Sequence, residues 1–218
     1  MQESNMNLIN MWRVIEMSID YFDEESHEYF RNGEKKPSVT DICKPVSSDR
    51  LGSLPPAMLE RASERGRRIH ELCQEYLLTD GNIDWDEIDP ADLPYIEQFD
   101  NWYITYQPKV LYSEFVMFSD EYCGTCDLVC EIDGKTYLVD FKTTSAVDKK
   151  SLSVQLEGYK RLLENIYGVD IDKTCYLWLN NRDKVDGYVF KEIVPNAEWF
   201  DVLLKHNEFM NKKEKERN

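Results

Sequence analysis

Alternating apolar and polar residues mark the middle of the chain as a set of strands. Residues 124–144 predict two strands joined by Asp133-Gly134, a dipeptide typical of two-residue hairpin turns. Residues 110–119 alternate as a preceding strand, with one face formed by Val110, Tyr112, Glu114, Val116 and Phe118. Further strands are predicted at 174–179 and 187–193, the second of them at a sheet edge. A short strand and turn are predicted at 27–33.

Apolar residues spaced by three and four predict helices on either side of these strands. The prolines at 55–56 introduce a helix over 57–78, and two more helices are predicted over 93–106 and 151–167. A helix also begins near 38, capped by Ser38 or Thr40, and another follows Asn196. Residues 8–19 fit an amphipathic helix, whereas 43–54 and 79–92 are predicted to be loops. Together the elements predict an α/β fold of the α+β type, with helices flanking a mixed central β-sheet.

The hairpin brings two acidic side chains together. With Asp133-Gly134 as the turn, the numbers of facing residues sum to 267, and Asp127 lies opposite Asp140 as a non-hydrogen-bonded pair. Carboxylates about 5 Å apart repel each other, and Lys142 shares the face of Asp140. A divalent cation between the carboxylates would explain this arrangement. A one-residue bulge would remove Asp127 from that face.

His70 lies beside the buried stripe of the 57–78 helix, in line with Gly66 and Gln74. Glycine inside a helix costs about 1 kcal/mol relative to alanine, so Gly66 predicts a close approach to a strand. An isolated histidine in this position is more often a core residue than a ligand. The unpaired acids of the hairpin favour a role for His70 as a metal ligand, because a neutral imidazole could complete a metal site.

Length and composition fit one soluble domain. The chain has 218 residues, 42% of them hydrophobic, and no apolar run near 18 residues. The polar N-terminal segment does not resemble an export signal, so we predict a cytoplasmic protein with no membrane partner.

The net charge of −16 argues against tight, sequence-independent binding of nucleic acid. The charge is unevenly distributed, however. Residues 76–140 contain 15 acids against only Lys109 and Lys135. The segments 61–68 and 142–161 are basic instead, with four arginines against one acid and five basic residues against two acids, respectively.

The six cysteines are predicted to be small buried residues. Cys126 and Cys130 fall with Leu128 on the hairpin face opposite Asp127, where they would pack under the sheet. Cys123, Cys126 and Cys130 have a spacing that could suggest a metal site, but no second cysteine pair or cysteine/histidine pair with zinc-site spacing occurs elsewhere.

Taken in order, these pieces resemble the PD-(D/E)XK nuclease superfamily, and its RecB-like branch in particular. This branch includes phage-type exonucleases, CRISPR adaptation nucleases and the mitochondrial genome maintenance exonuclease. The matching motifs are P-S-V-T-D-I at 37–42, G-R-R-I-H at 66–70, Glu114, G-T-C-D at 124–127, D-F-K at 140–142 and Q-x-x-x-Y at 155–159. Cys126 stands where the family usually has proline. The resemblance implies a restriction-endonuclease-like core at 37–210, an N-terminal extension at 1–36 packed on it, and a charged tail at 211–218.

The resemblance also implies a metal site. Mg²⁺ or Mn²⁺ would be bound by His70, Asp127, Asp140 and the backbone carbonyl of Phe141, with Glu114 placing the metal or its waters. Family members with an iron–sulfur cluster carry three cysteines downstream of the nuclease core. Here only one cysteine follows the motifs, so no cluster is predicted.

Three further residues receive roles from the same resemblance. Lys142 would orient the attacking water and stabilise developing charge, because an ammonium beside two carboxylates stays protonated and makes a poor base. Gln155 and Tyr159 would support the site and contact the nucleic-acid backbone. Simple packing explains Tyr159 equally well.

The sequence therefore predicts a divalent-metal-dependent deoxyribonuclease acting in recombination, repair or replication of DNA. Exonuclease action is favoured because no recognition domain is visible, and a phage origin fits the short architecture. Unwinding of DNA would need a helicase or recombination partner protein. Two alternatives stay open: a nuclease-fold module that binds DNA ends or a protein partner without cutting, which the charge of −16 favours, and RNA as substrate.

Overall fold

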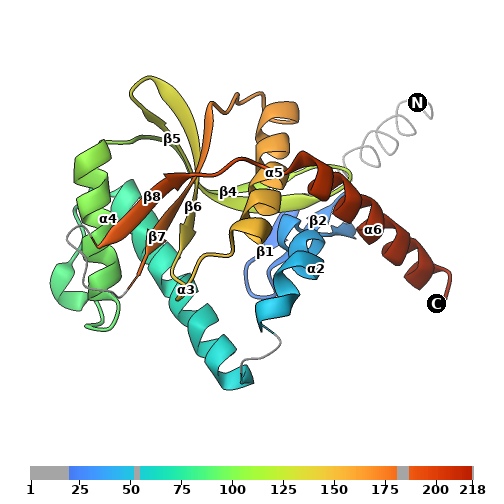
Figure 1. Ribbon diagram of the computed structural model, residues 1–218, viewed down its shortest axis with the longest axis horizontal. Coiled ribbons are helices and arrows are strands. Elements are labelled where there is room, and N and C mark those ends of the chain that lie inside the picture. Colours follow the sequence, from blue (N-terminus) through green and yellow to red (C-terminus); the bar gives the residue numbers. More distant parts are fainter. Residues whose placement is uncertain (1–19, 52–54, 181–186, 218) are drawn as a thin grey trace, which may run out of the picture.

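A five-stranded mixed sheet lies between two groups of helices in the computed structural model, which describes residues 20–51, 55–180 and 187–217 (Figure 1). In spatial order the strands are β4 (Lys109–Phe118), β5 (Cys123–Ile132), β6 (Lys135–Lys142), β7 (Lys173–Leu179) and β8 (Tyr188–Glu192). β6 and β7 are parallel, and the other neighbours are antiparallel. The predicted fold class is confirmed, as is the edge position of β8.

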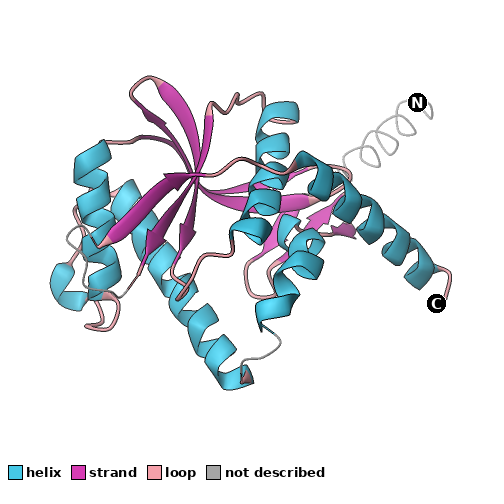
Figure 2. Ribbon diagram, in the orientation of Figure 1, coloured by secondary structure: helices cyan, strands magenta, loops and turns pink. Residues whose placement is uncertain are grey.

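Each face of the sheet has its own hydrophobic core. One core is covered by α2 (Val39–Leu51), α5 (Lys149–Asn165) and α6 (Ala197–Lys215). The other is covered by α3 (Pro56–Leu78) and α4 (Leu93–Tyr106), and the helices stand on both sides of the strands in Figure 2. Successive side chains of β6 contribute to the two cores in turn: Leu138 packs under α5, and Val139 packs under α3 and α4.

The predicted hairpin register is confirmed over five residue pairs. Asp133 and Gly134 adopt φ values of 51° and 71°, as a tight turn requires. The pairs run from Ile132–Lys135 to Leu128–Val139, all with numbers summing to 267. Beyond Leu128–Val139 the regular pairing of β5 with β6 ends.

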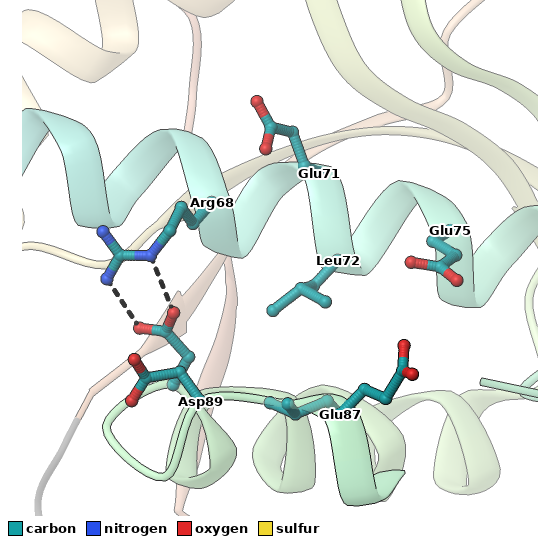
Figure 3. A pocket seen from close by; sticks show the side chains of 8 residues that line it. Arg68, Glu71, Leu72, Glu75, Glu87 and Asp89 are labelled. Carbon is teal, nitrogen blue, oxygen red and sulfur yellow. Dashed lines mark hydrogen bonds and ion pairs between the residues drawn. The ribbon is translucent and has the colours of Figure 1, made fainter. Parts of the chain in front are cut away.

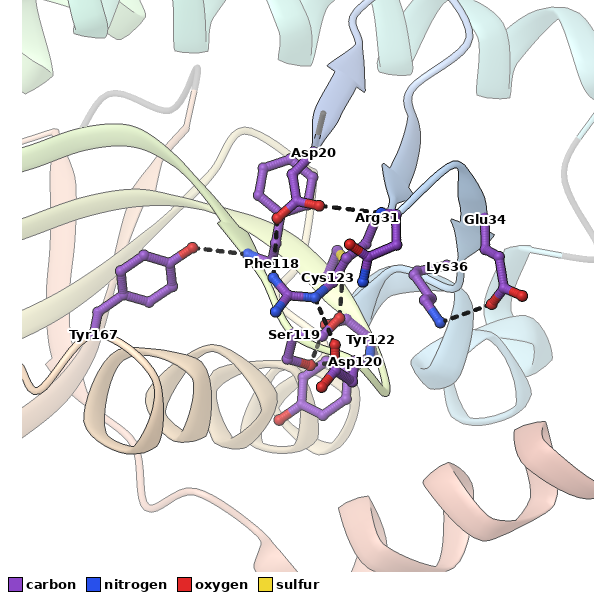
Figure 4. Close-up of polar contacts among 11 residues, drawn as sticks. Asp20, Arg31, Glu34, Lys36, Phe118, Ser119, Asp120, Tyr122, Cys123 and Tyr167 are labelled. Atoms are coloured by element: carbon purple, nitrogen blue, oxygen red, sulfur yellow. Dashed lines mark hydrogen bonds and ion pairs between the residues drawn. The ribbon is translucent and has the colours of Figure 1, made fainter. Parts of the chain in front are cut away.

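A small antiparallel sheet precedes the core and packs against it. It contains β1 (Tyr21–Asp23), β2 (Glu28–Arg31) and β3 (Glu34–Lys36), so the strand and turn predicted at 27–33 are confirmed. The buried Tyr29 forms a hydrogen bond with the Thr125 hydroxyl at 2.9 Å. Arg31 pairs with Asp20 and with Asp120, which lies in the β4–β5 turn (Figure 4). The helix predicted at 8–19 lies outside the described residues.

The predicted loop at 43–54 is wrong, because α2 continues to Leu51. Ser38 caps this helix, accepting a hydrogen bond from the Asp41 amide at 2.9 Å, while the Asp41 carboxylate accepts from the Ser38 amide at 3.0 Å. The helix includes Pro45, although proline usually ends a helix. Here Ile42 and Cys43 are buried in the core, and their packing holds the helix together across the proline.

The connector at 79–92 is less solvated than predicted. It contains a 3₁₀ turn at Trp85–Glu87, and both Ile88 and Asp92 are buried. The Asp92 carboxylate accepts two hydrogen bonds from Arg68, at 2.9 and 3.1 Å, which tie the connector to α3 (Figure 3). Beside this pair lies a cavity of about 310 Å³ lined largely by acids: Glu71, Glu75, Glu87, Asp89 and Asp92.

The C-terminal helix begins where predicted but extends further than predicted. The Asn196 side chain accepts a hydrogen bond from the Trp199 amide at 3.1 Å, which confirms the predicted cap. α6 runs through Lys215, so most of the predicted tail at 211–218 is helical. Within 20–51, 55–180 and 187–217, no helix has both the length and the apolar character needed to cross a membrane.

Two helical glycines should respond oppositely to alanine. A Cβ at Gly158 would lie 2.7 Å from the Phe200 ring and 2.8 Å from Val39, both fully buried, so overpacking should cost about 1–3 kcal/mol. A Cβ at Gly66 would meet only the Thr143 hydroxyl at 3.5 Å, an ordinary contact. Gly66→Ala should therefore gain up to about 1 kcal/mol of helix propensity. Urea unfolding of both variants measures the difference, and equal free energies of unfolding would contradict this packing.

Candidate active site

The candidate site lies where β5 and β6 separate. Cys126 packs in the core under α5, whereas Leu128 and Cys130 pack under α3 and α4, so the alternation of β5 breaks at Asp127. The prediction that Cys126 shares a face with Leu128 is wrong for this reason. In a regular ladder the Phe141 amide would donate to the Cys126 carbonyl. Here it donates to Oδ2 of Asp127 at 2.5 Å, which fixes the carboxylate at the opening between the strands.

Three predicted site residues converge at this opening from three different elements. Nδ1 of His70, on α3, lies 3.5 Å from a carboxylate oxygen of Glu114 and 3.5 Å from Oδ1 of Asp127. One ligand atom from each residue lies within 4.8 Å of the others. The neighbouring pairs Ser113–Leu128 and Phe115–Cys126 place Glu114 of β4 directly across from Asp127 of β5.

Glu114 enters the cluster through an irregular backbone. Its φ is +45°, a left-handed conformation that is uncommon for a residue with a side chain, and the β4–β5 register also shifts between Val110 and Tyr112. The predicted single apolar face of this strand is therefore wrong. Val110 pairs with Cys130, which is buried under α3 and α4, whereas Tyr112 pairs with Val129, which is buried in the opposite core.

The Glu114 carboxylate also carries an unsatisfied atom. Its Oε1 is buried and accepts no hydrogen bond among the residues that the structure describes; its charge partner is His70, whose Nδ1 lies 3.5 Å away. Backbone strain and an unsatisfied buried acid together are typical of a functional site, since neither stabilises the fold.

Charge is concentrated in the cluster. Burial alone would lower the pKa of His70, but the Asp127 and Glu114 carboxylates outweigh it and raise the pKa to about 10. Burial raises the pKa of Glu114, whereas the pKa of Asp127 is lowered because His70 outweighs the effect of burial. The site therefore attracts positive charge strongly.

Asp140 and Lys142 form an ion pair beside the cluster. Lys142 Nζ lies 2.6 Å from Oδ2 of Asp140, and the Asp140 side chain is buried. Burial raises the pKa of Asp140 to about 6 against the effect of Lys142, and the Asp127 charge contributes to this rise. Asp127 and Asp140 are thus close enough to interact. The cluster of ligand atoms within 4.8 Å of one another contains His70, Glu114 and Asp127 but not Asp140. Its role as a ligand stays a prediction, as does that of the Phe141 carbonyl.

A chain of polar contacts connects Lys142 to α5. Lys142 Nζ donates to Oε1 of Gln155 at 3.4 Å, and Nε2 of Gln155 donates to the Tyr159 hydroxyl at 3.1 Å. Tyr159 is also buried in the core, so the packing and supporting roles weighed for it from the sequence coexist. The structure thus joins both predicted substrate-binding residues to the predicted catalytic lysine.

The donor set fits a divalent cation. Two carboxylate oxygens and one imidazole nitrogen suit Mn²⁺, and the oxygens suit Mg²⁺, which keeps several waters in its coordination sphere. A bound cation would also satisfy the orphan oxygen of Glu114 and offset the charge of two converging acids. His70, Glu114 and Asp127 are the residues that would hold it.

No protein-family model matches the chain, and a search of curated proteins finds no match. Among solved structures, the chain is similar to the protein SSO0001, with 15% identity, coverage of 81% of this chain and 76% of that chain, and a TM-score of 0.39. It is also similar to an alkaline exonuclease (LHK-Exo) from Laribacter hongkongensis, with 12% identity, coverage of 84% and 95%, and a TM-score of 0.41.

Glu114→Gly should make the protein more stable and impair metal binding. Glycine removes a strained left-handed backbone, worth about 1–3 kcal/mol, and a buried carboxylate, against the lost attraction of that carboxylate for His70 and a glycine entropy cost of about 0.5–1 kcal/mol. Urea unfolding without divalent metal should show a gain of about 1 kcal/mol. Glu114→Gln, which keeps the backbone strain, should gain less. A glycine variant less stable than wild type would mean that the carboxylate supports the fold.

Proposed function

We propose that the chain is a divalent-metal-dependent nuclease that hydrolyses phosphodiester bonds, with Mg²⁺ or Mn²⁺ as cofactor. The observation that supports this most strongly is the convergence of His70, Glu114 and Asp127 within 4.8 Å, beside the Asp140–Lys142 ion pair. Acids, a histidine and a lysine around one opening combine a cation site with a fixed positive charge. Such a combination suits a reaction in which negative charge develops on a phosphate.

A bound divalent cation lowers the pKa of a coordinated water and polarises a phosphate. The chain's own residues position the reactants. The Phe141 amide holds one oxygen of Asp127, which leaves the other directed at His70. The left-handed turn at Glu114 directs its carboxylate to the same point.

Lys142 would act as a fixed cation and not as a base. Burial lowers its pKa, but the Asp140 and Asp127 carboxylates outweigh burial and raise the pKa above its usual value, so the ammonium stays protonated. Gln155 accepts from the same ammonium and limits its rotation. A protonated lysine held in this way can orient a water molecule and stabilise charge on the phosphate in the transition state.

The distribution of charge permits a nucleic-acid substrate despite the net charge of −16. The acids around the cavity in Figure 3 lie on the flank of α3 that helical spacing places opposite His70. The basic segments at 61–68 and 142–161 meet instead near the opening, where Arg65 contacts the Thr143 carbonyl. Basic side chains from both segments, Arg65 and Lys142, therefore lie near the opening.

The motif order supports a more specific proposal. We propose a RecB-like enzyme of the PD-(D/E)XK type acting on DNA, as an exonuclease, in recombination, repair or replication. A phage origin and a helicase or recombination partner belong to the same proposal. Its support is the intact set of His70, Asp127, Asp140 and Lys142 in the spacing described for the sequence.

A second candidate function is binding of DNA ends or a protein partner without cleavage. The net charge of −16 favours it, since weak nucleic-acid affinity would limit turnover. The two functions separate in one experiment: linear and circular DNA, single- and double-stranded, and RNA are incubated with Mg²⁺ or Mn²⁺ and with wild type, Asp140→Ala or Lys142→Ala. Loss of linear DNA with wild type alone is the expected result. Equal degradation by all three proteins would indicate a contaminant, and no degradation in any condition would favour the binding module.

A further inference from the structure

Arg65 occupies an unusual place next to the candidate site. Its guanidinium lies over the ring of the buried Tyr95 on α4, with Cζ 5.8 Å from the ring centroid. One terminal nitrogen approaches the Thr143 carbonyl at 3.5 Å. Thr143 directly follows Lys142, so Arg65 is held at the same end of β6 as the catalytic ion pair.

The contacts of Arg65 leave donors unused. The terminal contact is at the limit of hydrogen-bond length, and Nε is buried without any hydrogen-bond partner in the described part of the chain. An unsatisfied buried donor is costly, by about 1–3 kcal/mol, and more for a charged group. The other arginines of this segment are used differently: Arg68 binds Asp92 through two hydrogen bonds, and Arg67 lies 3.8 Å from Glu71.

Arg65 lies close to the cluster along β6. Its partner Thr143 is two residues from Phe141, whose amide holds Asp127, which corresponds to about 7 Å of strand. Successive phosphates of one duplex strand advance by about 3.4 Å along the helix axis, so about 7 Å spans about two steps. The planar guanidinium fork is suited to bind one phosphate through two parallel hydrogen bonds.

We propose that Arg65 binds a backbone phosphate one or two nucleotides from the bond being cleaved, and so positions the substrate strand over the cluster. This inference rests on the proposed nuclease function. Tyr95 and the Thr143 carbonyl hold the guanidinium in place, and its terminal nitrogens are the donors offered to the phosphate. Arg65 is a binding residue that does not touch the reacting atoms.

The test compares wild type with Arg65→Ala and Arg65→Lys on a series of DNA substrates. In each substrate a neutral methylphosphonate replaces one phosphate, at one of three positions on either side of the cleaved bond. Affinity is measured with Ca²⁺ in place of Mg²⁺, and KM and kcat are measured with Mg²⁺ for the unmodified substrate. Wild type should lose about tenfold in affinity at one position within two nucleotides of the cleaved bond. Arg65→Ala should bind unmodified DNA about tenfold more weakly and lose nothing further at that position.

Lysine at 65 keeps the charge but lacks the fork, so Arg65→Lys should recover only part of the affinity. Lys135→Ala is the control, because Lys135 is exposed at the hairpin end of β6, away from the opening, and should retain the wild-type response to every methylphosphonate. Thermal unfolding of each variant separates a loss of folding from a loss of binding. If Arg65 only binds the substrate, the two Arg65 variants should differ from wild type mainly in KM and little in kcat.

Two negative results have different meanings. If wild type cleaves DNA and Arg65→Ala keeps the wild-type affinity and the full methylphosphonate response, the role of Arg65 is overturned and the nuclease function stands. If wild type neither cleaves nor binds any nucleic acid with any divalent metal, the nuclease function fails and the role of Arg65 fails with it.

Discussion

Lys142→Met should lower kcat on DNA by about a hundredfold to a thousandfold, as expected when one group that stabilises transition-state charge is removed. Methionine has similar length but no charge, and it cannot donate to Gln155 or pair with Asp140. KM should change much less, because the lysine acts on the charge that develops during the reaction. Single-turnover cleavage of end-labelled DNA at saturating Mg²⁺ measures the effect on chemistry directly.

The matched control is Lys135→Met, on the same strand β6 but exposed at its hairpin end. It should retain wild-type kcat. Gln155→Ala should fall between the two, with a loss of about tenfold, because it frees the ammonium without removing it. If Lys142→Met cleaves as fast as Lys135→Met, the lysine has no part in the chemistry, and Asp140 binds it for structural reasons only.

Asp127→Asn should weaken Mn²⁺ binding by about a hundredfold or more, since changes even to residues that support metal ligands cost about 10–100-fold. Asparagine keeps the size of the side chain, and its carbonyl can still accept from the Phe141 amide. It removes the negative charge that faces His70. Isothermal titration calorimetry with Mn²⁺ measures the affinity.

Thermal unfolding provides a second measure of the same change. A ligand at about 100 times its Kd stabilises a protein by about 2.7 kcal/mol, so Mn²⁺ should raise the unfolding temperature of wild type by several degrees and that of Asp127→Asn by about one degree or less. Asp133→Asn is the control, because Asp133 lies in the hairpin turn, where its positive φ also suits asparagine. Similar Mn²⁺ affinities in all three proteins would place the metal elsewhere.

The hairpin was predictable because its determinants are local. The turn at Asp133-Gly134 fixes the register, and the count of residues from it follows without reference to the rest of the chain. The positions of α3 and α5 were equally predictable from apolar spacing, and with them the approach of His70, Gln155 and Tyr159 to the hairpin.

The distortions that form the cluster were not predictable in the same way. Regular alternation places Cys126 and Leu128 on one face, but tertiary packing divides them between two cores and turns Asp127 toward His70. The left-handed backbone at Glu114 is imposed by its surroundings and runs against the preference of the residue itself. The sequence hinted at Glu114 through a charge on an apolar strand, whereas the free donor of Arg65 gives no signal in the sequence.

The long α2 helix was missed for a related reason. Local rules place a helix end at Pro45, but burial of Ile42 and Cys43 against α5 and the sheet stabilises the continuation to Leu51. Tertiary packing overrode local preference here, as it did at Asp127.

The central claim is that His70, Glu114 and Asp127 form a divalent-metal site. The most direct test is a crystal grown with Mn²⁺, in which anomalous scattering locates the ion independently of any assumption about the site. We predict a Mn²⁺ ion coordinated by Asp127 together with Glu114 or His70, at the opening between β5 and β6. An anomalous map with no peak at this cluster under saturating Mn²⁺, or with the ion bound only among the acids around Glu71 and Glu75, would contradict it.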